Sequence, residues 1–464
     1  MPTDKQYDAI IVGSGQGGNP LAVKLAVSGW KTALVEKEHI GGSCVNVGCS
    51  PTKTMEASAR VAHLAGRAQD YGVHFDGDVR MDMEKVRQRK RDIVTSFSQG
   101  DRAKLERKGV DIFMGEACFT GPKEIEITLN EGATQRISGD KIFIDTGTRP
   151  NVPEIEGLDS CSALTNETIM ELDSVPEHLV VIGGGYVGCE FGRMFNRFGS
   201  KVTIIESCPH LFCREDQDVA EAVQEIFRND GIRIVLEGTV SRAAQDSDGI
   251  FHLTVNTDKG QEVISGTHLL VAAGRTPNTD MLNLETAGIE TDDRGYIKSD
   301  EKLRTTAPDI FVIGDVKGGP AFTHIAYDDY RVIKANLLEG ADVTISDRMV
   351  PYVVFIDPQL GRVGLTEGEA EEKGLSFKTV KMPMTHVARA LETDETQGFL
   401  KALVDKETGR ILGFAALCAD GGELMAVVQM AMVGGLTYRD LRNMIFAHPT
   451  LAESLNSLFG LVDR

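Results

Sequence analysis

The chain has 464 residues, of which 41% are hydrophobic and 25% are charged, and its formal net charge is −20. This length is sufficient for about two to four domains with extensive cores, and the composition is typical of a soluble globular protein. The strong negative charge disfavours contact with nucleic acid and with anionic membranes, so we expect neither as a partner.

The sequence contains no apolar run that approaches the roughly 18 residues of a membrane-spanning helix. The first residues, MPTDKQYDAIIVGSG, lack the apolar core of a signal peptide. We therefore expect a cytoplasmic protein. Its eight cysteines are not expected to form structural disulfides in a reducing compartment, so the closely spaced Cys44 and Cys49 need another explanation.

The first predicted unit binds a dinucleotide. An apolar run over 7–12 predicts a buried parallel strand, and a turn with Gly13, Gly15 and Gly18 follows it. A helix and a second strand come next, and that strand ends at Glu36. The glycines permit a tight turn and a close approach of pyrophosphate to the helix N-terminus, while Glu36 can accept hydrogen bonds from ribose hydroxyls.

The stretch over 41–53, GGSCVNVGCSPTK, carries both cysteines and precedes a run of helix-forming residues. Ser50 is the expected N-cap and Pro51 fits the first turn. Cys49 would then lie at a helix N-terminus, where the helix dipole favours a thiolate.

Three roles are open to the two cysteines, namely metal ligands, inert thiols or a redox pair. The C-x4-C spacing has no second ligand pair nearby, which makes it a poor zinc site. Inert thiols would not need the helix cap or the glycines at 41, 42 and 48, which let the backbone pass close to a flat ring. The pattern therefore favours a redox pair.

The strand, glycine turn, helix, strand and acid pattern returns over 178–206. Its glycines are Gly183, Gly185 and Gly188, and Glu206 follows the first glycine at the same spacing as Glu36 follows Gly13. Two copies in one chain predict two bound dinucleotides, which suggests a nicotinamide coenzyme that passes hydride to a flavin.

Glu206 also bears on the choice of nicotinamide coenzyme. A carboxylate at this place hydrogen-bonds the 2′-hydroxyl of NAD and repels the 2′-phosphate of NADP. Arg214 lies a short way downstream and weakens that argument. We expect NADH as the favoured coenzyme, with NADPH as the alternative.

Several motifs together resemble the flavin disulfide reductases, the class I pyridine nucleotide-disulfide oxidoreductases that include dihydrolipoyl dehydrogenase, glutathione reductase and mercuric reductase. They are GGSCVNVGCSPTK, DTGTRP at 145–150, GGGYVGCEF at 183–191, AAGRTPN at 272–278, IGD ending at Asp315, and HPTLAES at 448–454. The stretches FTHIAYDDYRVI and IFAHPTLAESLNSLFGLV resemble the mercuric-reductase-like branch that includes reactive-chlorine-resistance flavoproteins, regarded as hypothiocyanous acid reductases.

The resemblance implies an α/β fold with two Rossmann-like domains, one for FAD and one for NAD, and a C-terminal α+β dimerisation domain. The FAD domain would comprise 1–150 and 275–345, the NAD(P)H domain 151–274, and the dimer-interface domain 346–464. A homodimer is expected.

The resemblance also implies roles for the thiols. Cys49 would lie against the flavin and form the charge-transfer thiolate, and Cys44 would be the interchange thiol that meets the substrate. His448, oriented by Glu453, would act as acid and base in the active site of the partner subunit.

Further residues match flavin contacts of the family. Asp315 would bond the ribityl chain, Thr323 would add a contact, and Ala117 would meet the adenine through its backbone. Lys53 would lie near flavin N5 and pair with Glu190. Without the resemblance, a solvated helix charge would be the better interpretation of both Lys53 and Glu190.

Tyr186 resembles the aromatic lid that covers the flavin until nicotinamide binds, with simple packing beside the glycine turn as its alternative role. The resemblance adds further contacts in both coenzyme sites. These are Gly42 and Gly147 for FAD, and Val240 and Gly274 for NAD(P)H.

A second C-x4-C spacing occurs at Cys208 and Cys213, with His210 between them. The three residues could bind a soft metal, but no glycine cradle surrounds them. We expect unpaired surface or packing thiols here and no metal site in the chain.

The predicted reaction is ping-pong. NADH reduces FAD, the reduced flavin opens a Cys44–Cys49 disulfide, and the Cys44 thiolate attacks an electrophilic acceptor before Cys49 resolves the product. The preferred acceptor is hypothiocyanous acid, which would place the protein in defence against reactive oxidants.

Three alternatives stay open. Dihydrolipoyl dehydrogenase activity suits the disulfide, the histidine motif and Glu206, although Ser50 and Thr52 depart from the IPSK common in that group. Mercuric reduction is disfavoured because the last cysteine is Cys418, whereas true mercuric reductases carry a C-terminal cysteine pair. A soft-metal sensor or carrier built on Cys208, His210 and Cys213 is the remaining hypothesis.

Overall fold

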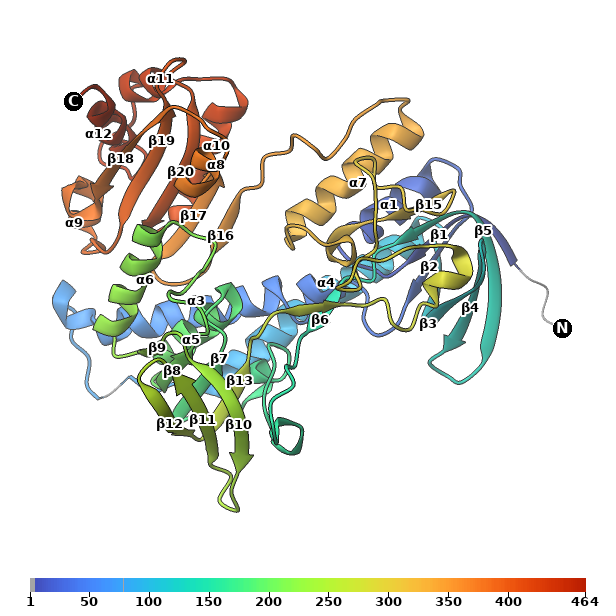
Figure 1. Ribbon diagram of the computed structural model, residues 1–464, viewed down its shortest axis with the longest axis horizontal. Helices are drawn as coiled ribbons and strands as arrows, with labels where there is room; N and C mark the ends of the chain where they lie inside the picture. The colour runs from blue at the N-terminus through green and yellow to red at the C-terminus, as the bar shows by residue number, and fades with distance from the viewer. Residues whose placement is uncertain (1–4, 78) are drawn as a thin grey trace. The chain divides into compact units, whose positions relative to one another are not determined.

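The computed structural model describes residues 5–77 and 79–464. The chain divides into two compact units (Figure 1). The first unit contains the described residues up to 55 together with 84–151 and 274–348, and the second contains the described residues of 56–83 with 152–273 and 349–464. The domain boundaries expected from the sequence stay a prediction.

The first unit is built on a six-stranded sheet. Its strands are β1 (Lys5–Val12), β2 (Thr32–Glu36), β3 (Asp111–Gly121), β4 (Glu124–Leu129), β5 (Thr134–Ile144) and β15 (Ile310–Val312). The strand pairs β1–β2, β2–β3, β1–β5 and β5–β15 are parallel. Strand β4 joins β3 and β5 in antiparallel pairing.

Both faces of this sheet are buried. Ile10 and Val12 of β1 lie in one hydrophobic cluster, and Ala9 and Ile11 lie in another on the opposite face. Successive side chains of a strand point to opposite faces, so a strand covered on both faces needs the continuous apolar run seen in β1. The sequence predicted this strand, and the prediction is confirmed.

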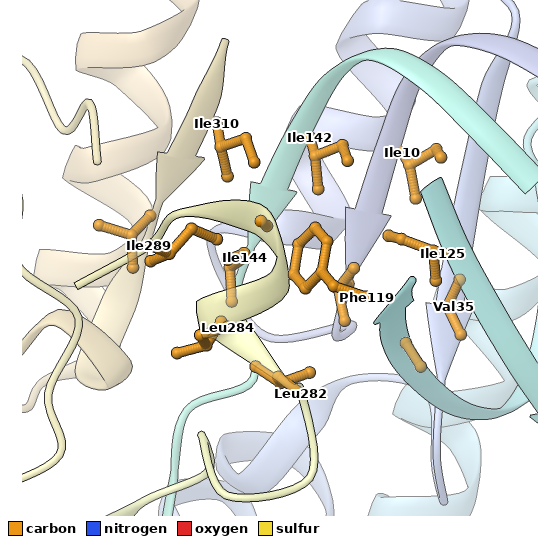
Figure 2. Packing of buried hydrophobic residues seen from close by; sticks show 14 of the residues in the cluster. Ile10, Val35, Phe119, Ile125, Ile142, Ile144, Leu282, Leu284, Ile289 and Ile310 are labelled. Carbon is orange, nitrogen blue, oxygen red and sulfur yellow. The ribbon is translucent and has the colours of Figure 1, made fainter. Parts of the chain in front are cut away.

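Different elements cover the two faces. Helices α1 (Gly18–Val27) and α7 (Thr323–Leu338) contribute apolar side chains to one cluster. Figure 2 shows the other cluster, where Phe119 lies among isoleucines of neighbouring strands, and Leu282 belongs to the same cluster. The remaining elements of this unit are α2 (Gly42–Asn46), the start of α3 (Cys49–Gly66), α4 (Met83–Arg107), β6 (Thr148–Pro150) and β14 (Arg275–Pro277), with 3-10 turns η4 (Leu284–Ala287) and η5 (Gly314–Lys317).

The second unit contains a parallel sheet of its own, in the order β13-β7-β8-β9. The strands are β7 (His178–Ile182), β8 (Lys201–Ile205), β9 (Arg233–Val235) and β13 (His268–Val271), and the helices are α5 (Tyr186–Phe198) and α6 (Gln217–Asn229). An antiparallel meander of β10 (Thr239–Gln245), β11 (Phe251–Thr257) and β12 (Gly260–Gly266) shares a hydrophobic cluster with this sheet.

The same unit ends in a five-stranded antiparallel sheet, ordered β16-β17-β20-β19-β18. Its strands are β16 (Tyr352–Val354), β17 (Gln359–Gly364), β18 (Phe377–Pro383), β19 (Phe399–Asp405) and β20 (Ile411–Cys418). The helices of this part are α8 (Glu367–Glu372), α9 (Ala388–Glu392), α10 (Gly421–Val433), α11 (Tyr438–Asn443) and α12 (Ser454–Gly460). The expected α/β class, with two Rossmann-like sheets and a C-terminal α+β part, is confirmed.

Within the described part of the chain, no helix is both long enough and apolar enough to cross a bilayer.

Candidate active site

The buried residue Asp145 packs against the first glycine turn and hydrogen-bonds to it. Gly13 has a φ of +99°, and a Cβ added to it would lie 2.2 Å from the carbonyl oxygen of Asp145. Asp145 Oδ2 accepts the N–H of Gly18 at 2.6 Å, and burial raises the pKa of this carboxyl well above its usual range. Only glycine therefore fits at position 13. The sequence motif DTGTRP did not predict this role of Asp145. The signal that could have indicated it is an acid directly after a buried strand.

Glu36 also hydrogen-bonds to the first glycine turn. Its Oε2 accepts the N–H of Ser14 at 3.0 Å and the Ser14 hydroxyl at 2.6 Å, while Oε1 accepts the N–H of Glu38 at 2.8 Å. The carboxylate is thereby oriented at the end of β2. Its hydrogen bond to a ribose stays a prediction.

Helix α2 docks directly on this turn. Gly42 has a φ of +63°, and a Cβ there would lie 2.8 Å from the Cα of Gly15. Gly147 and Gly274, at φ +64° and +95°, would meet nothing within 4 Å if each carried a Cβ. The tight glycine turn at the start of α1 fits the pyrophosphate of a dinucleotide. The free space at Gly147 and Gly274 fits its flanking groups.

Asp315 lies in η5, just after β15. Burial raises the pKa of its carboxyl, and the nearby cations Arg275 and Lys317 oppose that rise. Its Oδ2 lies 3.4 Å from the hydroxyl of Thr148, which also accepts the Nε–H of Arg275 at 2.6 Å. A half-buried, hydrogen-bonded carboxyl at this strand end fits the ribityl contact expected for it, which stays a prediction.

The two cysteines lie on separate helices of the first unit. Cys44 is in the short helix α2, which the sequence did not predict, and Cys49 is the first residue of α3. Ser50 is therefore not the N-cap, and the prediction of that cap is wrong. The Gly48 carbonyl instead accepts the N–H of Thr52 at 3.1 Å and so closes the first turn. The placement of Cys49 at a helix N-terminus is confirmed.

The two thiols are chemically different. Cys49 is exposed, and its Sγ lies 3.3 Å from the hydroxyl of Thr323. Cys44 is half-buried, and a hydrogen bond to Cys49, together with burial, raises the pKa of its thiol. In this dithiol form Cys44 retains the proton, and negative charge is favoured on the Cys49 sulfur, near the N-terminus of α3.

Lys53 lies one turn after Cys49 on α3, so both side chains leave the same side of the helix. Glu190 lies on α5 in the second unit, where its Oε1 accepts the N–H of Phe355 at 2.7 Å. Ala117 is buried in β3. The Lys53–Glu190 pair and the adenine contact of Ala117 stay predictions.

The second glycine turn repeats the first. Gly183 has a φ of +107°, and a Cβ there would lie 2.5 Å from the carbonyl oxygen of Ala272. Glu206 Oε2 accepts the N–H of Gly184 at 2.6 Å, as Glu36 does with Ser14 in the first unit. The turn leads into α5, and Gly185 would meet nothing within 4 Å if it carried a Cβ.

Two other residues expected at the nicotinamide site are packed within the second unit. The Tyr186 hydroxyl donates to Glu215 Oε1 at 3.2 Å, and its ring centroid lies 5.2 Å from Phe212 and 5.6 Å from Tyr352. Val240 is buried in the cluster of the meander. A lid role for Tyr186 would require its ring to leave these partners, and it stays a prediction, as does the coenzyme contact of Val240.

His448 and Glu453 form a hydrogen-bonded pair in the second unit. The imidazole Nδ1 lies 3.1 Å from Oε1 and 2.9 Å from Oε2 of Glu453, and the histidine side chain is 68% exposed. A carboxylate at Nδ1 fixes that proton and leaves Nε2 as the basic atom. This is the geometry expected of an acid–base pair, whose catalytic role stays a prediction.

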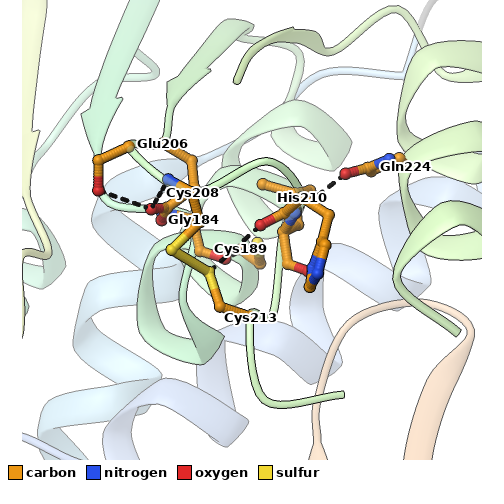
Figure 3. The surroundings of a disulfide bond; sticks show 9 residues. Gly184, Cys189, Glu206, Cys208, His210, Cys213 and Gln224 are labelled. Carbon is orange, nitrogen blue, oxygen red and sulfur yellow. Dashed lines mark hydrogen bonds between the residues drawn. A yellow bond between two sulfur atoms is a disulfide. The ribbon is translucent and has the colours of Figure 1, made fainter. Parts of the chain in front are cut away.

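The expectation of unpaired thiols at Cys208 and Cys213 is wrong, because the structure joins them in a disulfide (Figure 3). The chain turns back between them, which brings their Cα atoms to 6.5 Å. His210 Nδ1 lies 3.1 Å from the carbonyl of Leu211. In this disulfide form, both sulfurs that the soft-metal hypothesis needs are bonded to one another.

Known proteins resemble this chain along nearly its whole length. Residues 7–329 match the model of the pyridine nucleotide-disulphide oxidoreductases, and 350–459 match that of their dimerisation domain. The probable pyridine nucleotide-disulfide oxidoreductase RclA of Escherichia coli is 39% identical over 98% of this chain and 99% of the relative. A mercuric reductase of Staphylococcus aureus is 35% identical, over 97% of this chain and 82% of the relative. A dihydrolipoyl dehydrogenase of Haloferax volcanii is 34% identical, over 97% and 94%.

A solved structure described as the Cu(II) complex of the HOCl-induced flavoprotein disulfide reductase RclA from Escherichia coli superposes with a TM-score of 0.90 at 38% identity. It covers 99% of this chain and 100% of that chain.

Proposed function

Because the chain belongs to the pyridine nucleotide-disulphide oxidoreductase family, we propose that it transfers electrons from NADH, through FAD and the Cys44–Cys49 pair, to a small electrophilic oxidant. It is a flavoprotein NAD(P)H-dependent disulfide oxidoreductase with a dimerisation domain. The observation that carries the proposal is the unequal thiol pair, with exposed Cys49 at the start of α3 and half-buried Cys44 beside it. We expect the reaction to occur in the cytoplasm.

Bound FAD would supply two-electron transfer between the nicotinamide and the cysteine pair. The residues fit it, since Asp145 closes the glycine turn and Gly42 brings the cysteine-bearing helix α2 against Gly15. Lys53, Asp315 and the other residues expected at the flavin would orient the ring system beside Cys49.

The acceptor step uses the two cysteines in sequence. The Cys44 thiolate attacks the sulfur of hypothiocyanous acid, a new S–S bond forms and hydroxide leaves. The Cys49 thiolate then attacks Cys44 Sγ, the Cys44–Cys49 disulfide forms and thiocyanate leaves. His448 of the partner subunit would accept the Cys44 proton and deliver it to the departing hydroxide.

The raised pKa of Cys44 explains why such a base is needed. The hydrogen bond to Cys49 and burial keep Cys44 protonated at neutral pH, so this thiol becomes a nucleophile only when a base removes its proton. The His448–Glu453 pair has the chemistry for that task.

The choice of a reactive oxidant rests on the description of the Escherichia coli relative as HOCl-induced. NADH rather than NADPH rests on Glu206, whose carboxylate disfavours a 2′-phosphate. Dihydrolipoyl dehydrogenase and mercuric reductase activities stay as alternatives, because relatives of both kinds are similar along nearly the whole chain.

Steady-state assays test the proposal. The purified flavoprotein is offered hypothiocyanous acid, lipoamide, glutathione disulfide and Hg(II), each with NADH and with NADPH. We expect the highest kcat/KM with hypothiocyanous acid and NADH, and loss of that activity in Cys44→Ser. Cys161→Ser is the matched control, because this thiol contacts the Gly157 carbonyl and has no part in the reaction. Preferred turnover of lipoamide or Hg(II) would refute the acceptor, and full activity in Cys44→Ser would refute the mechanism.

A further inference from the structure

The loop over 206–216 connects β8 to α6 and contains the Cys208–Cys213 disulfide (Figure 3). Cys213 is exposed and Cys208 is half-buried. An exposed disulfide is open to attack by thiols, and the reduced cysteines would be open to small oxidants. The mechanism proposed above does not use this pair.

The first end of the loop holds Glu206, the acid expected at the coenzyme ribose. Glu206 Oε1 accepts the backbone N–H of Cys208 at 2.9 Å and lies 3.1 Å from the Ser207 hydroxyl, while Oε2 accepts the N–H of Gly184 at 2.6 Å. The carboxylate is thus oriented by the backbone of a disulfide-bonded residue. A change in the position of the Cys208 backbone would therefore change the orientation of the Glu206 carboxylate.

The other end of the loop reaches Tyr186. Phe212, the residue before Cys213, has a φ of +53°, and its buried ring packs edge-on against Tyr186 at 5.2 Å between centroids. A left-handed conformation is unfavourable for an aromatic residue, so surrounding contacts must impose it. The N–H of Phe212 donates to the carbonyl of Gly184 at 3.2 Å, and the disulfide fixes the next residue.

Beyond the disulfide, the loop is fixed by a buried ion pair. Glu215 Oε2 accepts the Nε–H and a terminal N–H of Arg362 at 3.0 and 2.7 Å, and Oε1 accepts the Tyr352 hydroxyl at 2.5 Å. The span between Glu206 and Glu215 is therefore anchored at both ends. The disulfide is the covalent constraint within it.

We propose that Cys208–Cys213 is a second, reversible redox site that sets the affinity of the chain for its nicotinamide coenzyme. The inference rests on the proposed function in that it takes the second glycine turn and Glu206 as the NADH site. The disulfide form holds the backbone that orients Glu206 in place before the coenzyme arrives, and a preorganised site binds more tightly. Reduction releases this constraint and weakens coenzyme binding.

The chemistry needs one oxidant and one reductant class. A thiolate of the pair attacks the halogen or sulfur atom of a hypohalous or hypothiocyanous acid, and hydroxide leaves. The second thiol then attacks the modified sulfur, the disulfide forms, and a halide or thiocyanate leaves with a proton released to solvent. A dithiol reverses the reaction through a mixed disulfide and is itself oxidised. The oxidants that the enzyme would remove would thereby raise its own affinity for NADH.

Thiol mapping tests the redox reaction without any activity assay. The flavin-loaded chain is equilibrated with mixtures of reduced and oxidised dithiothreitol, and differential alkylation with mass spectrometry reports the state of Cys208 and Cys213. We expect a two-electron transition between dithiol and disulfide, and reoxidation by one equivalent of hypothiocyanous acid. A pair that stays as thiols after the oxidant, or as a disulfide in excess dithiothreitol, overturns the inference.

Coenzyme binding is measured by calorimetry with NAD⁺, which leaves the flavin oxidised. We expect the Cys208→Ser/Cys213→Ser variant to bind about three- to tenfold more weakly than the oxidised wild type, and Cys161→Ser to bind as the wild type does. If the double variant folds poorly, oxidised and reduced Cys44→Ser protein give the same comparison, since its active-site pair cannot form a disulfide. Equal, measurable affinities overturn the inference alone, whereas no NAD⁺ binding in any state contradicts the proposed function as well.

Discussion

The Cys44 and Cys49 thiols share one motif but not one environment. Cys44 is half-buried in α2, and Cys49 is exposed at the first residue of α3, within 3.3 Å of the Thr323 hydroxyl. The hydrogen bond to Cys49 is the largest cause of the raised pKa of Cys44, and burial is the next. The order in which the two thiols lose their protons is therefore set by their contact with one another.

Replacing Cys49 by alanine should lower the pKa of Cys44, because its largest cause is removed while burial remains. A thiol with a raised pKa stays protonated, and therefore unreactive, up to a more alkaline pH. Lowering the pKa of Cys44 should therefore let the thiol react at a more acidic pH. We expect iodoacetamide labelling of Cys44 in the reduced protein to begin at least about one pH unit lower in Cys49→Ala than in the wild type. Mass spectrometry of the labelled peptide measures the profile.

Cys118 is the internal control for that experiment. Burial raises the pKa of its thiol, and the acids Glu126 and Glu116 add to the rise, so its labelling profile should not change in the variant. A Cys44 profile that stays in place or moves towards alkaline pH would show that Cys49 does not hold the Cys44 proton.

At the scale of elements, α2 lies backbone to backbone on the first glycine turn. The added Cβ in Gly42→Ala would lie 2.8 Å from Gly15 Cα in a φ of +63°. Alanine is disfavoured in this conformation and the clash adds to it, so we expect a loss of about 1–3 kcal/mol in unfolding free energy and reduced FAD retention. Urea unfolding and the ratio of flavin to protein absorbance measure the two effects.

Gly66→Ala is the matched control, because a Cβ at this helical position would meet nothing within 4 Å. Its stability and flavin content should equal or slightly exceed those of the wild type, since alanine favours the helix. If Gly42→Ala behaved in the same way, the close docking of α2 would not contribute to flavin binding.

Local sequence patterns predicted where the helices and strands lie better than they predicted which residues contact one another. The apolar runs before Gly13 and Gly183 are strands β1 and β7, because short continuous runs of this kind suit buried parallel strands. The roles of Asp145 and Thr148 could not be predicted in this way. Each depends on partners more than a hundred residues away, such as Gly18 for Asp145 and Asp315 for Thr148, and local periodicity carries no information about such contacts.

The cysteine pair at Cys208 and Cys213 shows the same limit at short range. Expected compartment and spacing favoured unpaired thiols, but pairing depends on the turn that Phe212 makes with a φ of +53°. Large residues seldom adopt that conformation, so neither composition nor propensity indicates it. The structure is needed to see that the buried ring of Phe212 holds the turn.

At the scale of the whole molecule, the dimerisation domain explains why large apolar side chains are exposed in the single chain. Met430, Val433 and Ile445 are 73%, 70% and 98% exposed in the single chain. Large apolar side chains that are this exposed in a single chain are candidates for an interface with a second subunit. Ile445 lies three residues before His448 in the sequence, so the same segment would carry both the dimer contact and the acid–base pair.

Mixing two inactive variants tests whether the active site is shared between subunits. One chain carries Cys44→Ser and the other His448→Gln. If His448 serves the partner subunit, each mixed dimer has one site with both residues intact, and random reassembly restores about a quarter of wild-type activity.

Each variant subjected alone to the same dissociation and reassembly is the control and should stay inactive. A mixture that also stays inactive, although native mass spectrometry detects the mixed dimers, would place His448 in the active site of its own chain.

The two acids expected at the coenzyme riboses have a consequence for engineering. Glu36 and Glu206 each accept the N–H of the residue after the first glycine of their turn, Ser14 and Gly184. A change at Glu206 designed to admit NADPH would therefore also remove the hydrogen bond that holds Gly184 in the second glycine turn. We expect the affinity for both coenzymes to fall together. Coenzyme exchange in this scaffold is better sought by adding a cation beside an intact Glu206 than by replacing the acid.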